Sequence, residues 1–146
     1  MRIAVLADTH NHLPDTLRGT LAEADEIWHL GDIGQRELLD SLHAIGPRVH
    51  AIRGNCDPHN LAPEALSLER CGLHFYLLHE PPELVPPGTD IALHGHTHAP
   101  RDETIGGIRY LNPGTVAKPN RGAPVSFAWL NLTEGAPPQW TVVPLP

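Results

Sequence analysis

The chain has 146 residues, of which 40% are hydrophobic and 18% are charged, and its formal net charge is −7. This length suits one ordinary hydrophobic core, so we expect a single domain over residues 1–146. The acidic balance makes the chain a poor candidate for a sequence-independent binder of nucleic acids or anionic membranes, because phosphate contacts require a basic surface. Bound divalent cations would reverse the local field, so a small phosphate-bearing substrate stays compatible with this charge.

The first half of the chain alternates strand and helix signals. Residues 2–7, 27–30 and 49–52 are short apolar runs of the kind that form buried parallel strands. Residues 13–24 and 37–45 carry leucines at helical spacing and are expected to form the two intervening helices. The order strand, helix, strand, helix, strand predicts a parallel sheet with covering helices.

The second half reads almost entirely as β structure. Six strands are expected, at residues 65–68, 73–78, 91–93, 108–111, 125–132 and 140–143. The stretch from Ile105 to Gly107, which has two glycines, predicts a hairpin turn. Helical periodicity is nearly absent after Ile45, so we expect two packed sheets with helices confined to the first half.

The cysteines and the first residues of the chain indicate the cellular compartment of the protein. Cys56 and Cys71 are its two cysteines, and the chain begins directly in a strand-like run without an export signal. No apolar run approaches the length of a membrane span. We therefore expect a cytoplasmic protein with free thiols and no membrane partner.

Potential metal ligands follow the ends of five expected strands. They are Asp8, His10, Asp32, Asn55, Cys56, Asp57, His79, His96 and His98. Because the carboxyl ends of parallel strands are where ligands bind in such sheets, we expect these side chains to converge at one edge.

Each segment taken alone also has a structural explanation. Asp8 could cap a helix, Gly54-Asn55 is a common turn pair, and His79 could be a core histidine. The segment Gly95-His96-Thr97-His98 is the most specific, because a His-x-His at a strand end has few structural uses. The presence of all five segments in one chain favours a metal site over five separate structural roles.

These segments, together with Asn112-Pro113-Gly114-Thr115, resemble the motifs of the calcineurin-like metallophosphoesterase superfamily. More narrowly, the chain is similar to the small single-domain branch that includes YfcE-type phosphodiesterases and the eukaryotic retromer scaffold subunit. The resemblance runs from Asp8 to Thr115 in family order. It implies an α/β fold, a four-layer α/β/β/α sandwich with two packed mixed sheets.

The same resemblance implies a centre with two divalent metal ions. The first ion would be held by Asp8, His10, Asp32 and His98, and the second by the bridging Asp32 with Asn55, His79 and His96. These oxygen and imidazole donors suit Mn²⁺, the metal we expect, with Fe, Zn²⁺, Ni²⁺ or Mg²⁺ as alternatives. The implied reaction is phosphodiester hydrolysis by a hydroxide that bridges the two metals, with Asp32 and Asn55 at the catalytic centre.

The residues after Asn55 depart from the larger members of the family. Cys56 stands where those proteins often carry a histidine that protonates the leaving group, so the general acid is unassigned. We interpret Cys56 as a small packed hydrophobe, with a catalytic role as the alternative. Asp57 either orients a ligand residue or caps the following turn.

The segment after His79 is a second departure. The family usually has a sizeable helix there, whereas residues 80–89 contain four prolines. Proline disrupts helix interiors, so this covering helix should be reduced or missing. Its loss should expose apolar sheet surface that a second copy of the chain could cover, and a homo-oligomer is therefore expected.

The sequence thus predicts a metal-dependent hydrolase with a small phosphoester substrate and no stable nucleic-acid partner. A non-catalytic protein-binding scaffold on the same fold is the alternative, although a scaffold would not need a complete ligand set. Arg53 and Arg101 are candidate phosphate contacts, with structural or surface roles equally open. His29 and His94 are expected to be packed structural histidines.

Overall fold

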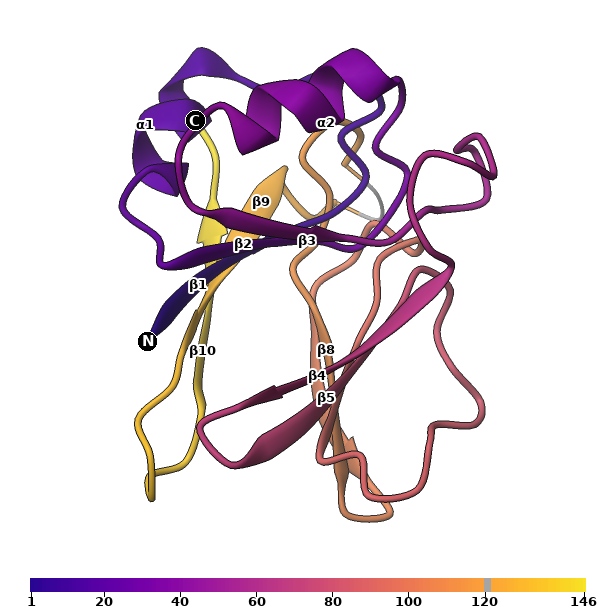
Figure 1. Ribbon diagram of the computed structural model, residues 1–146, viewed down its shortest axis with the longest axis vertical. Helices are drawn as coiled ribbons and strands as arrows, with labels where there is room; N and C mark the ends of the chain where they lie inside the picture. The colour runs from indigo at the N-terminus through magenta and orange to yellow at the C-terminus, as the bar shows by residue number, and fades with distance from the viewer. Residues whose placement is uncertain (120–121) are drawn as a thin grey trace.

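The computed structural model describes residues 1–119 and 122–146, which form two five-stranded mixed sheets and two helices (Figure 1). The order across the first sheet is β10 (Gln139–Pro144), β9 (Ser126–Asn131), β1 (Arg2–Leu6), β2 (Glu26–His29) and β3 (Arg48–Ala51). Strands β1, β2 and β3 are parallel, and β9 and β10 are antiparallel to their neighbours.

Both helices lie on one face of the first sheet (Figure 1). They are α1 (Asp15–Leu21) and α2 (Arg36–His43), as the leucine spacing predicts. Leu17 and Leu42 are buried against strand residues such as Leu6 and Ile27, which gives one of the two hydrophobic cores. Neither helix, in the part of the chain that the structure describes, is long and apolar enough to cross a membrane.

The second sheet packs against the opposite face of the first. Its order is β4 (Ala65–Arg70), β5 (Leu73–Leu78), β6 (Ile91–Leu93), β8 (Ile108–Asn112) and β7 (Arg101–Ile105). Strands β5, β6 and β8 are parallel, and β4 and β7 are antiparallel edges. Trp28 and Phe75 meet between the sheets with their ring centroids 5.2 Å apart, in a second buried core.

The sequence did not predict β7, although the hairpin that joins it to β8 was expected. Ile105 pairs with Ile108 across Gly106 and Gly107, which have φ of 59° and 81°, as a tight hairpin turn requires. Residues Arg101 to Thr104 carry three charges and little apolar pattern. Charged side chains suit an exposed edge strand, where they discourage pairing with another sheet, and they hide the strand from hydrophobic periodicity.

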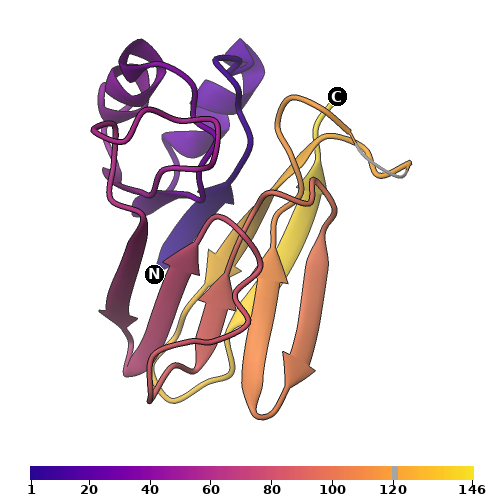
Figure 2. The ribbon, with the colours of Figure 1, turned by 90° about the vertical axis from the view of Figure 1, so that its right-hand side faces the viewer.

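The expected loss of a helix after His79 is confirmed. Residues 80–90 form bends and turns rather than a helix, and they run along the outer side of the second sheet (Figures 1 and 2). The sandwich is thus α/β/β with the fourth layer reduced to this segment. Its proline content explains the difference, because proline lacks the amide hydrogen that continues a helix.

Little apolar surface is left by this loss. The outward side chains of β4 and β5 include Ser67, Glu69, His74 and Tyr76, because their neighbours Leu68 and Phe75 face the core. Large hydrophobic side chains that are exposed among the described residues are Met1, Leu84 and Ile105, on three separate segments. Self-association stays a prediction, which light scattering at micromolar concentrations would test.

Candidate metal centre

The candidate ligands lie in loops that follow strands of both sheets. Asp8 and His10 follow β1, Asp32 follows β2 and Asn55 follows β3, whereas His79 follows β5 and both His96 and His98 follow β6. The two sheets therefore contribute to one cluster. The loops turn sharply, with positive φ at Asp8, His10, Asp32, His96 and His98 (44° to 68°). Such backbone geometry is unfavourable for residues other than glycine and is characteristic of functional sites.

The carboxylates and imidazoles converge within bonding range of a shared ion. Ligand atoms of Asp8, His10 and His98 lie within 4.8 Å of one another, and so do those of Asp8, Asp32 and His79. The closest approaches are 3.4 Å from His98 Nε2 to Asp8 Oδ1 and 3.4 Å from His79 Nε2 to Asp32 Oδ2. Carboxylate and imidazole donors in this arrangement fit a hard or borderline divalent cation.

Three buried ligand atoms in this cluster have no hydrogen-bond partner, namely Asp8 Oδ1, His10 Nε2 and His79 Nε2. Burying such atoms unpaired is costly, which makes them a good fit for a cation. His79 Nδ1 donates to the Leu30 carbonyl at 2.7 Å, and His98 Nδ1 donates to the Lys118 carbonyl at 3.0 Å. Each bond fixes the tautomer in which the Nε2 lone pair points to the cluster.

The protonation equilibria of these groups are strongly perturbed. The pKa of Asp8 is raised to about 7, mainly because the carboxyl is buried; His79 opposes this rise and the neighbouring Asp32 adds to it. Burial also acts to raise the pKa of Asp32, but His79 and the Cys56 amide outweigh it and hold the pKa well below the usual range. A proton at Asp8 thus occupies a position that a cation would take.

Asn55 and the two residues after it are positioned by direct contacts. Asn55 Oδ1 lies 3.1 Å from His96 Nδ1, so these two candidate ligands are adjacent. Asp57 accepts hydrogen bonds from the amides of Ile33, Gly34 and Gly54 at 2.8–3.1 Å. Of the two roles open for Asp57, the contacts support orientation, since this carboxylate joins the loop after Asp32 to the loop that carries Asn55.

The interpretation of Cys56 as a packed hydrophobe is wrong. Cys56 is exposed, and its sulfur lies within 4.8 Å of ligand atoms of His10 and Asp32. Its amide donates to Asp32 Oδ1 at 3.0 Å, which holds the turn against the carboxylate and away from the core.

His29 connects two of the ligand loops, a role that the sequence analysis missed. The amide of Gly31 donates to His29 Nδ1 at 3.1 Å, so the ring hydrogen is on Nε2, which donates to Thr9 Oγ1 at 3.0 Å. The Thr9 hydroxyl then donates to the Ile33 carbonyl at 2.8 Å. Burial lowers the pKa of His29 to about 3, so the ring stays neutral. This chain of bonds ties the Asp8 loop to the Asp32 loop.

His94 is buried behind the other two histidines of its motif. Its Nδ1 donates to the Gly95 carbonyl at 2.9 Å, and its Nε2 accepts from Arg101 at 3.1 Å. The expected structural role of His94 is confirmed. Arg101 also bonds Glu103 at 3.0 Å and stacks on Tyr110, so this guanidinium supports the fold and is not directed at a phosphate.

The Asn112–Thr115 segment supports the same loops. Asn112 Nδ2 donates to the Gly95 carbonyl and to Thr97 Oγ1, each at 3.0 Å. Thr115 Oγ1 donates to the Asp8 carbonyl at 3.3 Å. These contacts give the segment a structural role beneath the ligand loops.

Comparison with known proteins identifies the family of the chain that carries this cluster. The sequence profile of the calcineurin-like phosphoesterase superfamily domain matches residues 1–135. The chain belongs to the calcineurin-like phosphoesterase superfamily. Among its relatives in this superfamily is the phosphodiesterase YfcE of Escherichia coli, with 31% identity across 90% of this chain and 88% of that protein. Another is the probable metallophosphoesterase MJ0623 of Methanocaldococcus jannaschii, with 32% identity across 82% of this chain and 70% of that protein.

Solved structures share the fold of this calcineurin-like phosphoesterase. The E. coli phosphoesterase YfcE superposes with a TM-score of 0.76 and 26% identity over 90% of this chain and 88% of that one. Zinc-bound Vps29 from Entamoeba histolytica superposes with a TM-score of 0.78 and 20% identity over 98% of each chain. The second likeness, at this identity, concerns the fold alone.

The His29 chain in this phosphoesterase predicts a specific effect of Thr9→Val. The valine keeps the shape but leaves the His29 Nε2 hydrogen unpaired in the core. We expect unfolding by urea to require about 1–3 kcal/mol less free energy, and Mn²⁺ to bind more weakly. Thr9→Ser restores the hydroxyl and should recover both properties. Full stability and metal affinity in Thr9→Val would contradict the bridging role of this hydroxyl.

The raised pKa of Asp8 predicts proton release when this phosphoesterase binds a cation. Below pH 7 the Asp8 carboxyl holds a proton that a metal must displace, so release should be larger at about pH 6 than at about pH 8.5. Titration calorimetry of Mn²⁺ in two buffers with different ionisation enthalpies measures the protons released. Asp102→Asn, which alters a carboxyl paired with Arg109, is the control and should leave the release unchanged. Heats independent of buffer at pH 6 would refute the prediction.

Proposed function

We propose that this chain is a metal-dependent phosphodiesterase whose centre holds two divalent cations, in one catalytic domain. Asp8, His10, Asp32 and His98 would hold the first cation, and Asp32, Asn55, His79 and His96 the second. The observation that carries the proposal is the set of three unpaired buried ligand atoms, which belong to Asp8, His10 and His79. When bound, such cations acidify a water and neutralise charge on the phosphoryl oxygens.

The residues of the chain have separate tasks in this proposal. Asp32 presents Oδ2 to both His79 and His10, at 3.4 and 3.7 Å, which suits a carboxylate shared between two ions. Asn55 is exposed at the open side of the cluster and touches His96, so it is available to both a cation and the substrate. His29 and Asp57 act as positioning residues, because they bind the loops and not the reacting atoms.

Mn²⁺ is the metal we propose, because oxygen and imidazole donors dominate the cluster; Fe, Zn²⁺, Ni²⁺ and Mg²⁺ are the competing ions. We also propose a cytoplasmic location, which suits the two cysteines, since Cys56 and Cys71 are both free. The substrate class in this proposal is a small phosphodiester, because the acidic chain disfavours a polyanionic partner.

The deciding experiment offers purified protein a panel of phosphodiesters, phosphomonoesters and cyclic nucleotides with each of the five metals. We expect hydrolysis of an aryl phosphodiester that requires Mn²⁺ and stops on chelation. Metal binding without hydrolysis of any ester would contradict the enzyme and favour a non-catalytic scaffold on this fold.

A further inference from the structure

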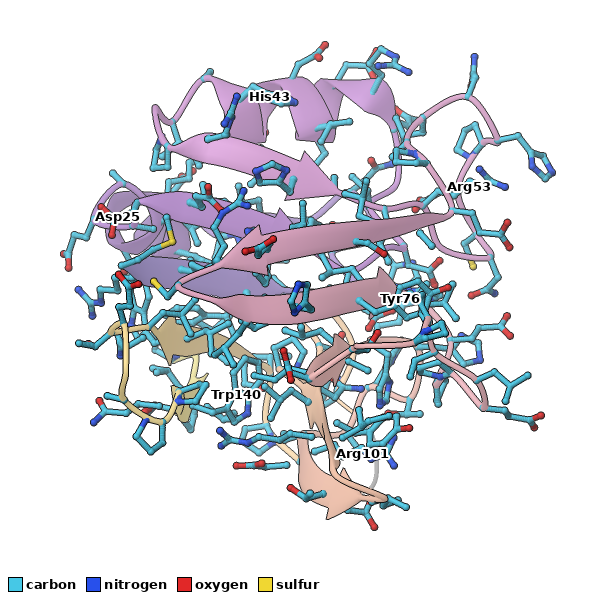
Figure 3. The ribbon with its side chains drawn as sticks, turned by 60° about the horizontal axis from the view of Figure 1, so that its bottom comes forward. Asp25, His43, Arg53, Tyr76, Arg101 and Trp140 are labelled. Carbon is cyan, nitrogen blue, oxygen red and sulfur yellow. The ribbon has the colours of Figure 1, made fainter. Side chains whose placement is uncertain are left out.

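A cavity of about 270 Å³ opens beside the candidate metal centre. One part of its wall consists of the candidate ligands Asn55 and His79. The rest is lined by Arg53, Gly54, Asp57, His59, Glu64, Leu78 and Glu80. Figure 3 shows Arg53 at the edge of the molecule where the chain enters β4, at one end of the strands. A phosphodiester whose phosphate lies against Asn55 and His79 therefore has this cavity available for one of its two ester substituents.

The basic group in this cavity, Arg53, already has contacts within the protein. Arg53 is the single arginine or lysine among the described residues that line it. Its Nη1 lies 3.4 Å from the Ala62 carbonyl and 3.5 Å from the His59 carbonyl, and its Nη2 lies 3.8 Å from Glu64 Oε2. The Glu64 contact offsets part of the Arg53 charge within the protein.

Acidic groups outnumber this arginine. Asp57, Glu64 and Glu80 line the cavity, which gives three carboxylates against one guanidinium. Asp57 is bound by three backbone amides and Glu64 faces Arg53, while Glu80 is exposed and has no ion-pair partner among the described residues. The protein's own charges therefore disfavour a negatively charged substituent and favour a positively charged one in the part of the cavity that Glu64 and Glu80 line, whereas cations at Asn55 and His79 would attract the phosphate.

The dimensions restrict the substituent further. Pockets for drug-sized ligands usually have volumes of roughly 300–1,000 Å³, and this one lies just below that range. Leu78 contributes an apolar patch that suits methylene or methyl groups. A small alcohol fits, whereas a long or branched polymer chain would have to extend into solvent.

We propose that this cavity binds one ester substituent of the phosphodiester and selects a small cationic alcohol, of the amino-alcohol class, over an anionic alcohol. The selection depends on Glu64 and Glu80, which we assign as specificity-determining residues. The inference rests on the proposed function, because the phosphate is assumed to lie at the metal ligands.

Three methyl phosphodiesters of matched shape test the proposal. Their second substituents are choline, its uncharged isostere 3,3-dimethylbutyl, and the anionic 3-carboxy-3-methylbutyl group. Since methyl is too small to fill the cavity, the variable group is the substituent that can occupy it. Each compound competes against hydrolysis of bis-p-nitrophenyl phosphate in Mn²⁺, and its Ki is measured. We expect the choline ester to bind roughly threefold or more tightly than the neutral ester, the scale of partly exposed charge interactions, and the anionic ester to bind most weakly.

Variants identify the residues responsible. The double variant Glu64→Gln/Glu80→Gln should bring the three Ki values close together. Glu83→Gln removes the same charge from the neighbouring loop outside the cavity and should leave the ratios unchanged. Equal Ki values in the unmodified protein, or ratios that persist in the double variant, would overturn the inference. If bis-p-nitrophenyl phosphate itself is not hydrolysed, the proposed function fails instead.

Discussion

Asp32→Asn is expected to reduce hydrolysis of an aryl phosphodiester at least about a thousandfold, which corresponds to about 4 kcal/mol of transition-state stabilisation. Asp32 Oδ2 faces both His10 and His79, so the loss of its charge weakens both halves of the proposed metal centre. Asparagine is the better substitution than alanine for a structural reason. Asp32 has a φ of 53°, a conformation that asparagine tolerates and alanine does not.

The variant should remain folded, which separates lost chemistry from lost structure. The Oδ1 of asparagine can still accept the hydrogen bond that the Cys56 amide donates to Asp32 Oδ1 at 3.0 Å. The substitution also removes the repulsion between the carboxylates of Asp8 and Asp32. Activity, bound metal and thermal unfolding are measured in parallel. Asp40→Asn, at an exposed position on α2, is the matched control and should keep full activity. Mn²⁺-stimulated hydrolysis by Asp32→Asn at a rate near that of the control would refute the assignment.

Arg70→Met is expected to produce the largest loss of stability, about 3–5 kcal/mol, because it leaves a buried carboxylate without its ionic partner. Glu26 on β2 is buried, and Arg70 on β4 reaches it with Nε at 3.1 and 3.2 Å and with Nη2 at 3.0 Å. Trp28 Nε1 also donates to this carboxylate at 2.8 Å. The pair connects the two sheets at the edge where β2 begins.

Removal of the carboxylate that Arg70→Met leaves unpaired provides a second test. Adding Glu26→Gln should recover much of the loss. Arg18→Met, which removes an exposed pair with Asp15, is the control and should cost less than about 1 kcal/mol. A deficit no larger than that of Arg18→Met would show that the buried pair is unimportant.

Much of this architecture could be predicted because it depends on patterns that sequence records directly. Apolar runs and leucine spacing predicted the three parallel strands and both helices, and the ends of those strands located Asp8 and Asp32. β7 was not predictable in this way, because an edge strand such as Arg101–Ile105 has no buried face that requires apolar residues.

The contacts of individual side chains were the least predictable feature. Arg101 looked available to a phosphate, and only the fold shows that His94 and Glu103 occupy it. His29 looked like an ordinary strand residue, because its partners Thr9 and Gly31 approach it through loops whose sharp turns no local pattern specifies. The exposure of Cys56 was not predicted either, because it depends on the turn that Asp32 holds through the Cys56 amide.

The division of the candidate ligands between the two sheets has a mechanical consequence. Asp8 and Asp32 extend from the first sheet and His79 and His98 from the second, so each of the two proposed cations would have ligands from both sheets and would cross-link the sandwich at the carboxyl ends of its strands. At the other end of β2, the ion pair of Glu26 and Arg70 joins the same two sheets without a metal. An ion at a hundred times its Kd adds about 2.7 kcal/mol to the folded state. The two sheets would then be joined at one end by an ion pair of the chain and at the other by bound cations. The rigidity of the edge that carries the candidate ligands would therefore depend on the concentration of metal ions in solution.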